Sequence, residues 1–517
     1  MATTYLSPGV YVEEVDRGPK PIQGVSTSVA AFVGFAEKGP IDEATLVTNW
    51  TQFTETFGGL LPGAFLPYSV YGYFNNGGGS CYVLRLPTRK DGKEPPAVPV
   101  GTTKLLSRGA TPIPTLSVSA KEPVQEVEVS VGPSSEPGAT DDQFDMTFKG
   151  GDKTETFTGL SFSTRKGAKT VVETINATST LVVVEDLAAP GSLTERVPVA
   201  GTYPLALPKE TALEKVEVSA KTFEGDVAER KGIGGLEVIE EITMLCAPDL
   251  MSAYLAGALD DTGLRAAQLA MISHCENMGD RVAIVDAPPG LTSQQVAKWR
   301  KEIAGYDSKY AALYYPWIEI TDRDGKPFML PPSGHVAGIW ARVDSERGVH
   351  KAPANEIVRG ALGVESQVTK GEQDLLNPMG VNCIRKFPGR GIRVWGARLL
   401  SSDPAWRYIN VRRLFNYVEE SIREGTQWVV FEPNDPFLWG RVTRDISAFL
   451  RTVWRGGALF GTTPEQSFYV KCDAELNPPE VRDQGQLIVE IGLAPVKPAE
   501  FVIFRISQWA GGAVGGA

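Results

Sequence analysis

Histidine and cysteine are the residue types that most often hold metal ions or attack substrates, and this sequence has few of either. The three histidines are His274, His335 and His350. His274 precedes Cys275 in a predicted helix, where successive side chains diverge by about 100°, so we do not expect them to share a metal or form a catalytic pair. His335 and His350 have no Cys or carboxylate at a recognised ligand spacing. The sequence therefore predicts no metal site.

Two further segments carry residues of a kind found in active sites. The loop KGIGG at residues 231–235 resembles a phosphate-binding loop, but it does not lie directly between a strand and a helix, as that site requires. Asp286 ends a predicted buried strand, and ligands of α/β proteins bind at the carboxyl ends of such strands. An α/β enzyme with Asp286 in its site is therefore one alternative. Because no nucleophile or metal set accompanies Asp286, we favour a role as a turn cap, and we predict no catalytic residue, no cofactor and no enzyme.

One predicted helix carries a basic face. It begins at Pro436, after an Asp435 N-cap, and ends before two glycines. Its apolar residues fall within one arc of the helical wheel, and the opposite side holds four arginines, here called the arginine ridge: Arg441, Arg444, Arg451 and Arg455. Arginine is enriched at interfaces and pairs with carboxylates in a planar, bidentate geometry. We predict that the ridge contacts an acidic protein surface; phosphate ranks second, and a solvated face is the structural alternative.

Composition limits the classes of protein that these residues can serve. The chain has 517 residues, 42% of them hydrophobic, and a net charge of −11, which excludes a generally basic nucleic-acid binder. No stretch approaches the roughly 20 apolar residues of a membrane helix, and the start, MATTYLSPGV, does not resemble a secretory signal. Five scattered cysteines fit a reducing cytoplasm. We expect a cytoplasmic, multidomain protein that binds neither nucleic acid nor membrane directly.

The predicted elements give the fold class α/β plus β. Short continuous apolar runs at residues 30–35, 81–86, 242–246, 282–286 and 311–317 suit strands buried on both faces, and helical patterns follow at 262–278 and 292–304. They predict a discontinuous, layered α/β domain at residues 23–90 and 231–359. Residues 91–230 alternate with period two and predict an all-β insertion, whose stretch 95–230 is acidic, with 13 Lys and Arg against 19 Asp and Glu.

The C-terminal part predicts an α+β domain at residues 360–498. A helix is expected to open at Asp403-Pro404, the ridge helix follows, and strands are expected at 467–472 and 486–493. The domain contains the basic stretch of the chain: residues 381–460 hold 13 Lys and Arg, 12 of them Arg, against 7 Asp and Glu.

Each end of the chain predicts a single strand without a local partner. An N-terminal arm, residues 1–22, contains a strand at 10–15 that is bounded by Pro8 and the pair Gly18-Pro19. A C-terminal strand and Gly/Ala-rich tail, residues 499–517, follow Pro495 and Pro498. A lone strand exposes unpaired backbone groups that can add to another sheet. Pairing within the chain and donation to a neighbouring subunit are both consistent with this pattern.

Several long segments of the sequence carry a distinctive order of residues. Those near the N-terminus are SPGVYVEEV and GVSTSVAAFVGFAEKGP. The later ones are PPSGHVAGIWARVDSERGVHKAPAN, LNPMGVNCIRKFPGRGIRVWGARLL, DPAWRYINVRRLFNYVEESI, GTQWVVFEPND, WRGGALFGTTPEQSFYVKCDAELNPPE and PAEFVIFRISQ. In these segments the sequence resembles the contractile tail sheath proteins of phages and phage tail-like injection systems. The resemblance covers the first 90 or so residues and roughly residues 235–510, but not the β insertion.

The resemblance implies a structural role. Sheath subunits stack as hexameric rings around an inner tube and contract to drive the tube through a target envelope. The implied partners are other copies of the chain, the inner tube protein, and baseplate and terminator or cap proteins. The chain would be made in the bacterial cytoplasm and become part of a phage tail or tail-like particle.

The resemblance also assigns roles to the two end strands. In the family, each joins the C-terminal-domain sheet of a neighbouring subunit and completes it. The donated side chains here would be Val10, Tyr11, Val12, Glu13, Val15, Phe501, Val502, Ile503, Phe504 and Ile506. The acceptor sheet would contain Phe468, Val470, Leu487, Val489 and Ile491. The C-terminal domain lines the lumen in the family, so the arginine ridge would contact the tube; this last assignment comes from the helical wheel and not from a family motif.

Overall fold

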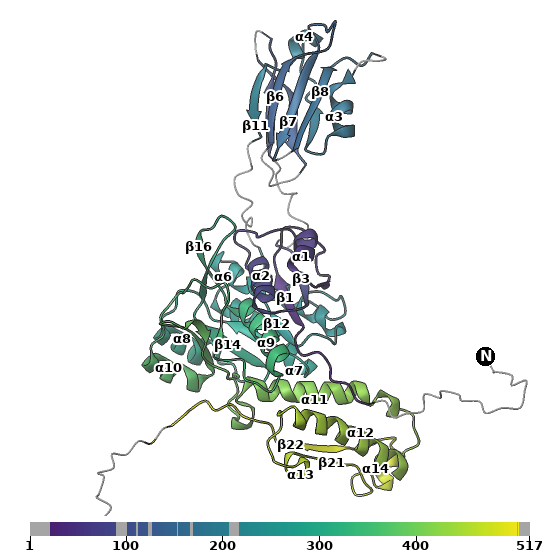
Figure 1. Cartoon of the computed structure of the whole chain (residues 1–517), viewed down its shortest axis with the longest axis vertical. Helices are drawn as coiled ribbons and strands as arrows, with labels where there is room; N and C mark the ends of the chain where they lie inside the picture. Colours follow the sequence, from purple (N-terminus) through teal and green to yellow (C-terminus); the bar gives the residue numbers. More distant parts are fainter. Residues whose placement is uncertain are drawn as a thin grey trace, which may run out of the picture. The chain divides into compact units, whose positions relative to one another are not determined.

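The computed structural model describes residues 21–88, 101–109, 112–121, 127–151, 153–165, 169–205, 217–503 and 505. The chain forms two compact units, which Figure 1 shows as ribbons. The first consists of Met1–Leu60, Phe65–Leu86 and Ser219–Ala517, and the second of Leu61–Ala64 and Pro87–Val218. The backbone N–H of Glu217 donates to the carbonyl oxygen of Thr88 at 2.9 Å, so the chain enters and leaves the second unit at neighbouring points.

A nine-stranded sheet with the order β17-β20-β19-β14-β13-β12-β1-β3-β2 forms the centre of the first unit. The six strands from β19 to β3 are parallel, and antiparallel strands complete both edges. The strands are β1 (Ala30–Gly34), β2 (Thr45–Val47), β3 (Cys81–Arg85), β12 (Met244–Cys246), β13 (Val282–Asp286), β14 (Ala311–Tyr315), β17 (Glu356–Ile357), β19 (Val381–Phe387) and β20 (Gly391–Val394). The five runs predicted as strands form β1, β3, β12, β13 and β14, because continuous apolar runs tolerate burial on both faces.

Several helices pack on this sheet: α7 and α9 contact β13, α2 and α6 contact β1, and α10 contacts β19. Helix α2 lies so close to α9 that a Cβ atom on Gly338 would be 2.4 Å from the backbone oxygen of Tyr73, so this contact requires glycine. The two predicted helices correspond to α7 and to α8 with its π-helical extension η2. The helical elements are α1 (Trp50–Phe57), α2 (Leu66–Asn76), α5 (Ala220–Glu224), η1 (Ile233–Val238), α6 (Asp249–Leu255), α7 (Asp261–Met278), α8 (Ser293–Trp299), η2 (Arg300–Ala304), α9 (Ser333–Arg347), α10 (Lys370–Leu376) and η3 (Asn377–Met379).

A three-stranded sheet with the order β16-β15-β18 also belongs to the first unit. Its strands are β15 (Ile318–Thr321), β16 (Pro327–Leu330) and β18 (Gly363–Val364). Across the described ranges of both units, no helix has the length and apolarity needed to span a membrane.

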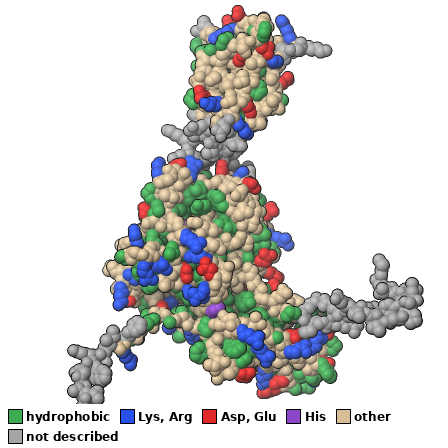
Figure 2. All heavy atoms as spheres, viewed as in Figure 1, with side chains coloured by type: hydrophobic (Ala, Val, Ile, Leu, Met, Phe, Trp, Pro, Cys, Tyr) green, Lys and Arg blue, Asp and Glu red, His purple; other side chains and the backbone are tan. Residues whose placement is uncertain are grey.

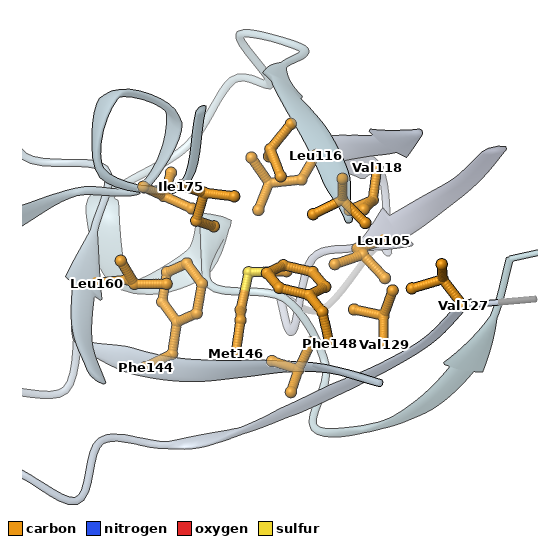
Figure 3. Close-up of a cluster of buried hydrophobic side chains, with 14 of the residues drawn as sticks. Leu105, Leu116, Val118, Val127, Val129, Phe144, Met146, Phe148, Leu160 and Ile175 are labelled. Carbon is orange, nitrogen blue, oxygen red and sulfur yellow. The ribbon is translucent and has the colours of Figure 1, made fainter. Parts of the chain in front are cut away.

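The second unit consists of two sheets around a core of its own, and all their strand pairs are antiparallel except the parallel pair β8-β9. Figure 3 shows Phe144, Met146 and Phe148 converging with Leu116 and Val118 in that core. The strands are β4 (Thr102–Leu106), β5 (Pro114–Ala120), β6 (Val127–Pro133), β7 (Phe144–Gly150), β8 (Lys153–Ser161), β9 (Lys169–Thr170), β10 (Val182–Asp186) and β11 (Gly201–Pro204). The unit also contains the helices α3 (Val171–Thr178) and α4 (Leu193–Arg196). The prediction of an all-β insertion was therefore wrong, because the unit contains helices as well as strands.

The helix α3 escaped prediction because its apolar pattern is short. Val171 and Ile175 are one helical turn apart, and both side chains are buried in the core of the second unit. Two apolar residues at this spacing within eight residues are too few to indicate a helix among alternating strands.

Two of the predicted domain boundaries differ from the structure. Residues 219–230 were assigned to the insertion, but α5 packs on α7 of the first unit, and the buried ring of Phe223 contacts Phe35 with a centroid distance of 5.9 Å. The C-terminal domain was expected to begin at residue 360, yet β19 pairs in parallel with β14 of the nine-stranded sheet, beginning at Leu313↔Val381. Both differences arise from contacts between residues that are far apart in the sequence.

The C-terminal part of the first unit contains two long helices and a two-stranded sheet (Figure 1). Its elements are η4 (Pro404–Trp406), α11 (Ile409–Gly425), η5 (Gln427–Val429), α12 (Pro436–Arg455), α13 (Pro464–Ser467), β21 (Phe468–Lys471), α14 (Pro479–Asp483) and β22 (Glu490–Leu493). The helix predicted from Asp403-Pro404 is two elements, because the Asp403 cap opens only the 3-10 turn η4, and α11 begins after it. The Asp435 cap is confirmed: its carboxylate accepts a hydrogen bond from the backbone N–H of Leu438 at 2.9 Å.

Candidate interaction surfaces

The arginine ridge lies on the exposed face of α12. Arg441, Arg444, Arg451 and Arg455 are all exposed, and the buried residues of the helix are Leu438, Trp439, Val442, Ile446, Phe449, Leu450 and Val453. The guanidinium of Arg441 lies 4.2 Å from the centre of the Trp428 ring, and Arg444 Nε is 3.2 Å from the carboxylate of Asp445. The predicted division of the helix into apolar and cationic faces is confirmed. Figure 2 shows Lys and Arg side chains on the surface of the lobe that holds α11 and α12.

Two exposed phenylalanines, one before α12 and one on its first turn, were not predicted from the sequence. Phe437, on the first turn of α12, has a relative exposure of 84%, and it precedes Arg441 and Arg444 by four and seven residues on the same face. Phe431 is fully exposed and has a φ of +69°, a left-handed conformation that is strained for a bulky side chain. Phe437 could have been found, because the wheel that places the arginines also places it on the outer face.

The predicted acceptor strands form the small sheet β21-β22, in which Val470 pairs with Ile491. Over the described residues neither strand pairs with a third strand. The side chains named for the acceptor are partly buried and pack on the hydrophobic core between α11 and α12: Phe468, Val470, Leu487, Val489 and Ile491. The sheet is thus attached to the subunit by one face, and its outer backbone edges are not used by described strands.

The second acceptor strand is shorter than expected. Leu487 and Val489 precede β22, which begins at Glu490. The Asn477 side chain accepts a hydrogen bond from the N–H of Ile488 at 2.7 Å and donates one to its carbonyl at 3.0 Å. Because these bonds take the place of strand pairing, the ladder starts only after Val489.

Part of each predicted linking strand lies outside the described residues. This applies to Val10, Tyr11, Val12, Glu13, Val15, Phe504 and Ile506. Phe501, Val502 and Ile503 are described; they form no strand within this chain and have relative exposures of 70, 68 and 79%. Three consecutive apolar side chains with this exposure are available to a partner.

The N-terminal segment is fixed along α11 from Ile22 onward. The Ile22 side chain is buried in the core beside Gly425, where a Cβ atom would approach it to 2.7 Å. The N–H of Val25 donates to the Ser421 hydroxyl at 3.1 Å. These contacts attach the root of the N-terminal arm to the C-terminal half of α11.

The C-terminal segment is fixed at Glu500. Arg398 donates to both carboxylate oxygens, from Nε at 2.9 Å and from an Nη at 2.7 Å. Asn377 and Tyr408 donate to the same carboxylate at 2.7 and 2.9 Å. Partial burial raises the pKa of Glu500, but the hydrogen bonds from Arg398, Asn377 and Tyr408 outweigh it and hold the pKa below its usual value. We call these four residues the Glu500 clamp; the sequence analysis did not identify it.

Asp286 is a buried structural cap. Its carboxylate accepts a hydrogen bond from the N–H of Ser333, the first residue of α9, at 2.9 Å. Desolvation raises its pKa to about 7. The expected turn-capping role was wrong in its partner, because Asp286 caps a distant helix and not the turn that follows it.

The other candidate chemical residues are also engaged in structure. In the loop at 231–235, the N–H of Gly232 donates to the Asp42 carboxylate at 3.2 Å, so that amide is not directed at a phosphate. Burial lowers the pKa of His274 and His335 to about 4 each. No group of three or more His, Cys, Asp or Glu able to hold a metal ion occurs in the described part of the chain.

Comparison with protein families assigns most of the first unit. Residues 240–398 match the phage tail sheath protein central domain, and residues 401–508 match the phage tail sheath C-terminal domain. Together the two matches span more than half of the chain. The chain belongs to the contractile tail sheath family. The family consists of structural sheath proteins, so the alternative of an enzyme with Asp286 in its site was wrong. The change of family domain near residue 400 agrees with the position of β19 in the nine-stranded sheet.

Individual relatives agree with this assignment. The chain is 27% identical over 257 residues to a putative prophage major tail sheath protein of Pseudomonas aeruginosa, covering 47% of this chain and 64% of that protein. It is 27% identical over 242 residues to the tail sheath protein of Burkholderia phage BcepMu, covering 43% of this chain and 49% of that protein. The alignments thus span 49 and 64% of the length of these two relatives.

Solved structures share the fold over nearly the whole chain. The helical sheath of the anti-feeding prophage in its contracted state aligns with a TM-score of 0.58 and 24% identity, covering 98% of this chain and all of that one. A sheath tail protein of Desulfitobacterium hafniense aligns with a TM-score of 0.53 and 11% identity, covering 90% of this chain and 94% of that one. The mixed α/β architecture with several sheets is therefore a sheath fold.

Proposed function

We propose that this chain is the structural subunit of a contractile sheath, which polymerises as stacked hexameric rings around an inner tube and contracts to drive that tube through a target envelope. The observation that carries the proposal is the small sheet β21-β22, whose outer edges pair with no described strand, in a chain whose consecutive apolar residues 501–503 are exposed. Unpaired edges and an unpaired apolar segment are the two halves of a strand-addition contact.

The subunits are linked by donated strands in this proposal. Residues 10–15 and 501–507 of one subunit extend the β21-β22 sheets of its neighbours and complete the C-terminal domain. Several backbone hydrogen bonds form at each link and do not depend on side-chain identity. Such links persist while the bodies of the subunits rotate as rigid units, which is the motion that contraction requires.

The arginine ridge faces the inner tube in this proposal. Four exposed guanidinium groups on one helix complement an acidic partner, and exposed ion pairs contribute only about 0–1 kcal/mol each. Contacts of this strength position the sheath on the tube but are released ring by ring during contraction. The free energy that drives contraction is then stored when the sheath assembles, because the contracted sheath has a lower free energy than the extended one.

The proposed sheath function also assigns a role to each domain of the chain. Residues 1–22 and 499–517 are linking arms, the discontinuous α/β domain is the layered body of the wall, and the insertion within 91–230 faces outward. The subunit's partners are other copies of itself, the tube protein, the baseplate and a terminator or cap. It is made in the cytoplasm of the producing bacterium and becomes part of a phage tail or tail-like particle.

Negative-stain electron microscopy of the purified chain, alone and after co-expression with its tube protein, tests the proposal. We expect hollow, ridged tubes whose averaged cross-sections have sixfold symmetry. A uniformly monomeric chain under both conditions would contradict the sheath function.

A further inference from the structure

The roots of both linking arms are attached to one helix, α11. The N-terminal anchor lies along its C-terminal half, at Ser421 and Gly425, and the C-terminal anchor includes Tyr408, the residue that precedes its first turn. Tyr408 lies 13 residues before Ser421 and 17 before Gly425, so the two anchors lie about 20–25 Å apart along the helix axis. Figure 1 shows α11 as one continuous helix.

The Glu500 clamp connects the C-terminal arm to the central sheet. Arg398, which holds the carboxylate, exchanges two hydrogen bonds with the Asn382 side chain: its N–H donates at 2.7 Å, and its carbonyl accepts at 2.8 Å. Asn382 is fully buried in β19. Arg398 therefore connects Glu500 to a strand of the nine-stranded sheet.

The segment before the clamp is also held. The N–H of Val496 donates to the carbonyl of Ala458, and its own carbonyl accepts from the Asn410 side chain at 3.1 Å. The segment that contains Pro495 and Pro498 is therefore held against the first unit up to the clamp. Glu500 is held by the clamp, whereas the side chain of the next residue, Phe501, is 70% exposed.

We propose that the Glu500 carboxylate is the fixed pivot of the C-terminal linking arm, and that α11 is the strut that keeps the pivots of the two arms at a constant separation. This inference rests on the sheath function proposed above. Glu500 and Arg398 are positioning residues, because they set where the donated strand begins and in which direction it leaves, without themselves touching the neighbouring sheet.

Loss of the clamp weakens the link between subunits without unfolding the subunit. An arm whose root is free loses more backbone entropy when it docks. Each additional residue that must be ordered on docking lowers the equilibrium constant for docking by a factor of about 5 to 30. Glu500→Ala removes the acceptor of four hydrogen bonds at the periphery of the fold, whereas Glu480→Ala makes the same change of charge on exposed α14 and is the matched control.

The test compares wild type, E500A, E500Q, E480A and a chain lacking residues 501–517. Critical concentrations are measured by pelleting, monomer stability by thermal unfolding, and local mobility by hydrogen exchange of the monomer. We expect E500A to raise the critical concentration about 5- to 30-fold and E500Q, which keeps the size of the side chain, to raise it less. E480A should match wild type, and the deletion should abolish polymerisation. The backbone amides of the non-proline residues within 494–500 should exchange faster in E500A and E500Q than in wild type.

The outcomes separate this inference from the proposed function. If the deletion polymerises like wild type, the C-terminal arm is no link, and the linking function itself fails. If the deletion abolishes polymerisation but E500A keeps the wild-type critical concentration, the pivot is wrong and the linking function stands. Unchanged exchange of residues 494–500 in E500Q would also overturn the pivot, even if E500A proved too unstable to assay.

Discussion

Arg413 of α11 donates two hydrogen bonds to the carboxylate of Asp344 in α9, with N–O distances of 2.9 and 2.6 Å. Both side chains are buried, with relative exposures of 3 and 4%. Thr27 completes the site: its hydroxyl donates to Asp344, and its carbonyl accepts from Arg413. The helix that carries both arm anchors is thereby joined to a helix that packs on the nine-stranded sheet.

Removal of one partner of this pair should destabilise the subunit strongly. We expect Arg413→Ala to lower the free energy of unfolding by about 3–5 kcal/mol, because it leaves the Asp344 carboxylate buried without its counter-charge. Urea unfolding of the monomer measures the change. The double variant R413M/D344L should recover much of the loss, since replacing a whole buried ion pair by apolar side chains is often close to neutral. A single variant as stable as wild type would show that the pair does not join the two helices.

Deletion of residues 1–15 should leave a folded subunit that no longer polymerises. The contacts of Ile22, Val25 and Thr27 remain after this truncation, so the thermal unfolding midpoint should stay within a few degrees of wild type. Pelleting and electron microscopy measure polymer formation. Normal tubes from the truncated chain would refute strand donation at this end.

Charge reversal on the arginine ridge should weaken assembly on the inner tube. We expect the double variant R444E/R451E to need several-fold more protein for tube-templated assembly, with the largest difference at low salt, because exposed charge contacts are screened by ions. Co-sedimentation with purified tubes over a salt series measures this. The control K298E/K301E makes the same charge change on exposed residues of α8 and η2. If the two double variants assemble equally well, the arginine ridge is a solvated helix face and does not contact the tube.

Asp286 should make the stability of the subunit depend on pH. Burial raises its pKa to about 7, above the value of about 3.8 for a free Asp, so the folded state binds the proton more tightly than the unfolded state does. The stabilising effect is fully present below about pH 4 and is lost as the pH rises through 7. Relative to Asp286→Asn, wild type should lose up to about 1.4 kcal/mol per pH unit across this window.

Unfolding in urea at several pH values measures the difference between the two proteins. The side-chain amide introduced by Asp286→Asn keeps an oxygen that can accept from the N–H of Ser333, so the variant should fold, and its assembly and contraction should match wild type. A difference in stability that does not change with pH would contradict the raised pKa.

The sequence predicted elements whose signal is local. Continuous apolar runs identified the strands β1, β3, β12, β13 and β14, and the Asp435 cap with the following wheel identified α12 and its two faces. Each of these features depends on residues only a few positions apart, so a short stretch of sequence is enough to predict it. The resemblance to sheath proteins, carried by long ordered segments, supplied the family.

Features made by distant residues escaped prediction. Glu500 is an ordinary acidic residue in a Pro-containing segment, and only the fold brings Asn377, Arg398 and Tyr408 to its carboxylate. The sequence of β19 is equally consistent with a strand of the C-terminal domain and with a strand of the nine-stranded sheet, and only its pairing with β14 distinguishes the two. Asp286 was expected to act on its own turn, whereas its partner Ser333 is 47 residues away. Pairings of this kind are set by topology and not by periodicity.

The hydrogen bond between Thr88 and Glu217 has a practical consequence for engineering. A module whose two ends meet at one backbone contact, and which has its own hydrophobic core, is suited to exchange for a foreign domain with adjacent termini. In the sheath proposed above, each subunit would then carry one copy of an enzyme, an epitope or a receptor-binding protein, while the residues of the first unit keep their native sequence.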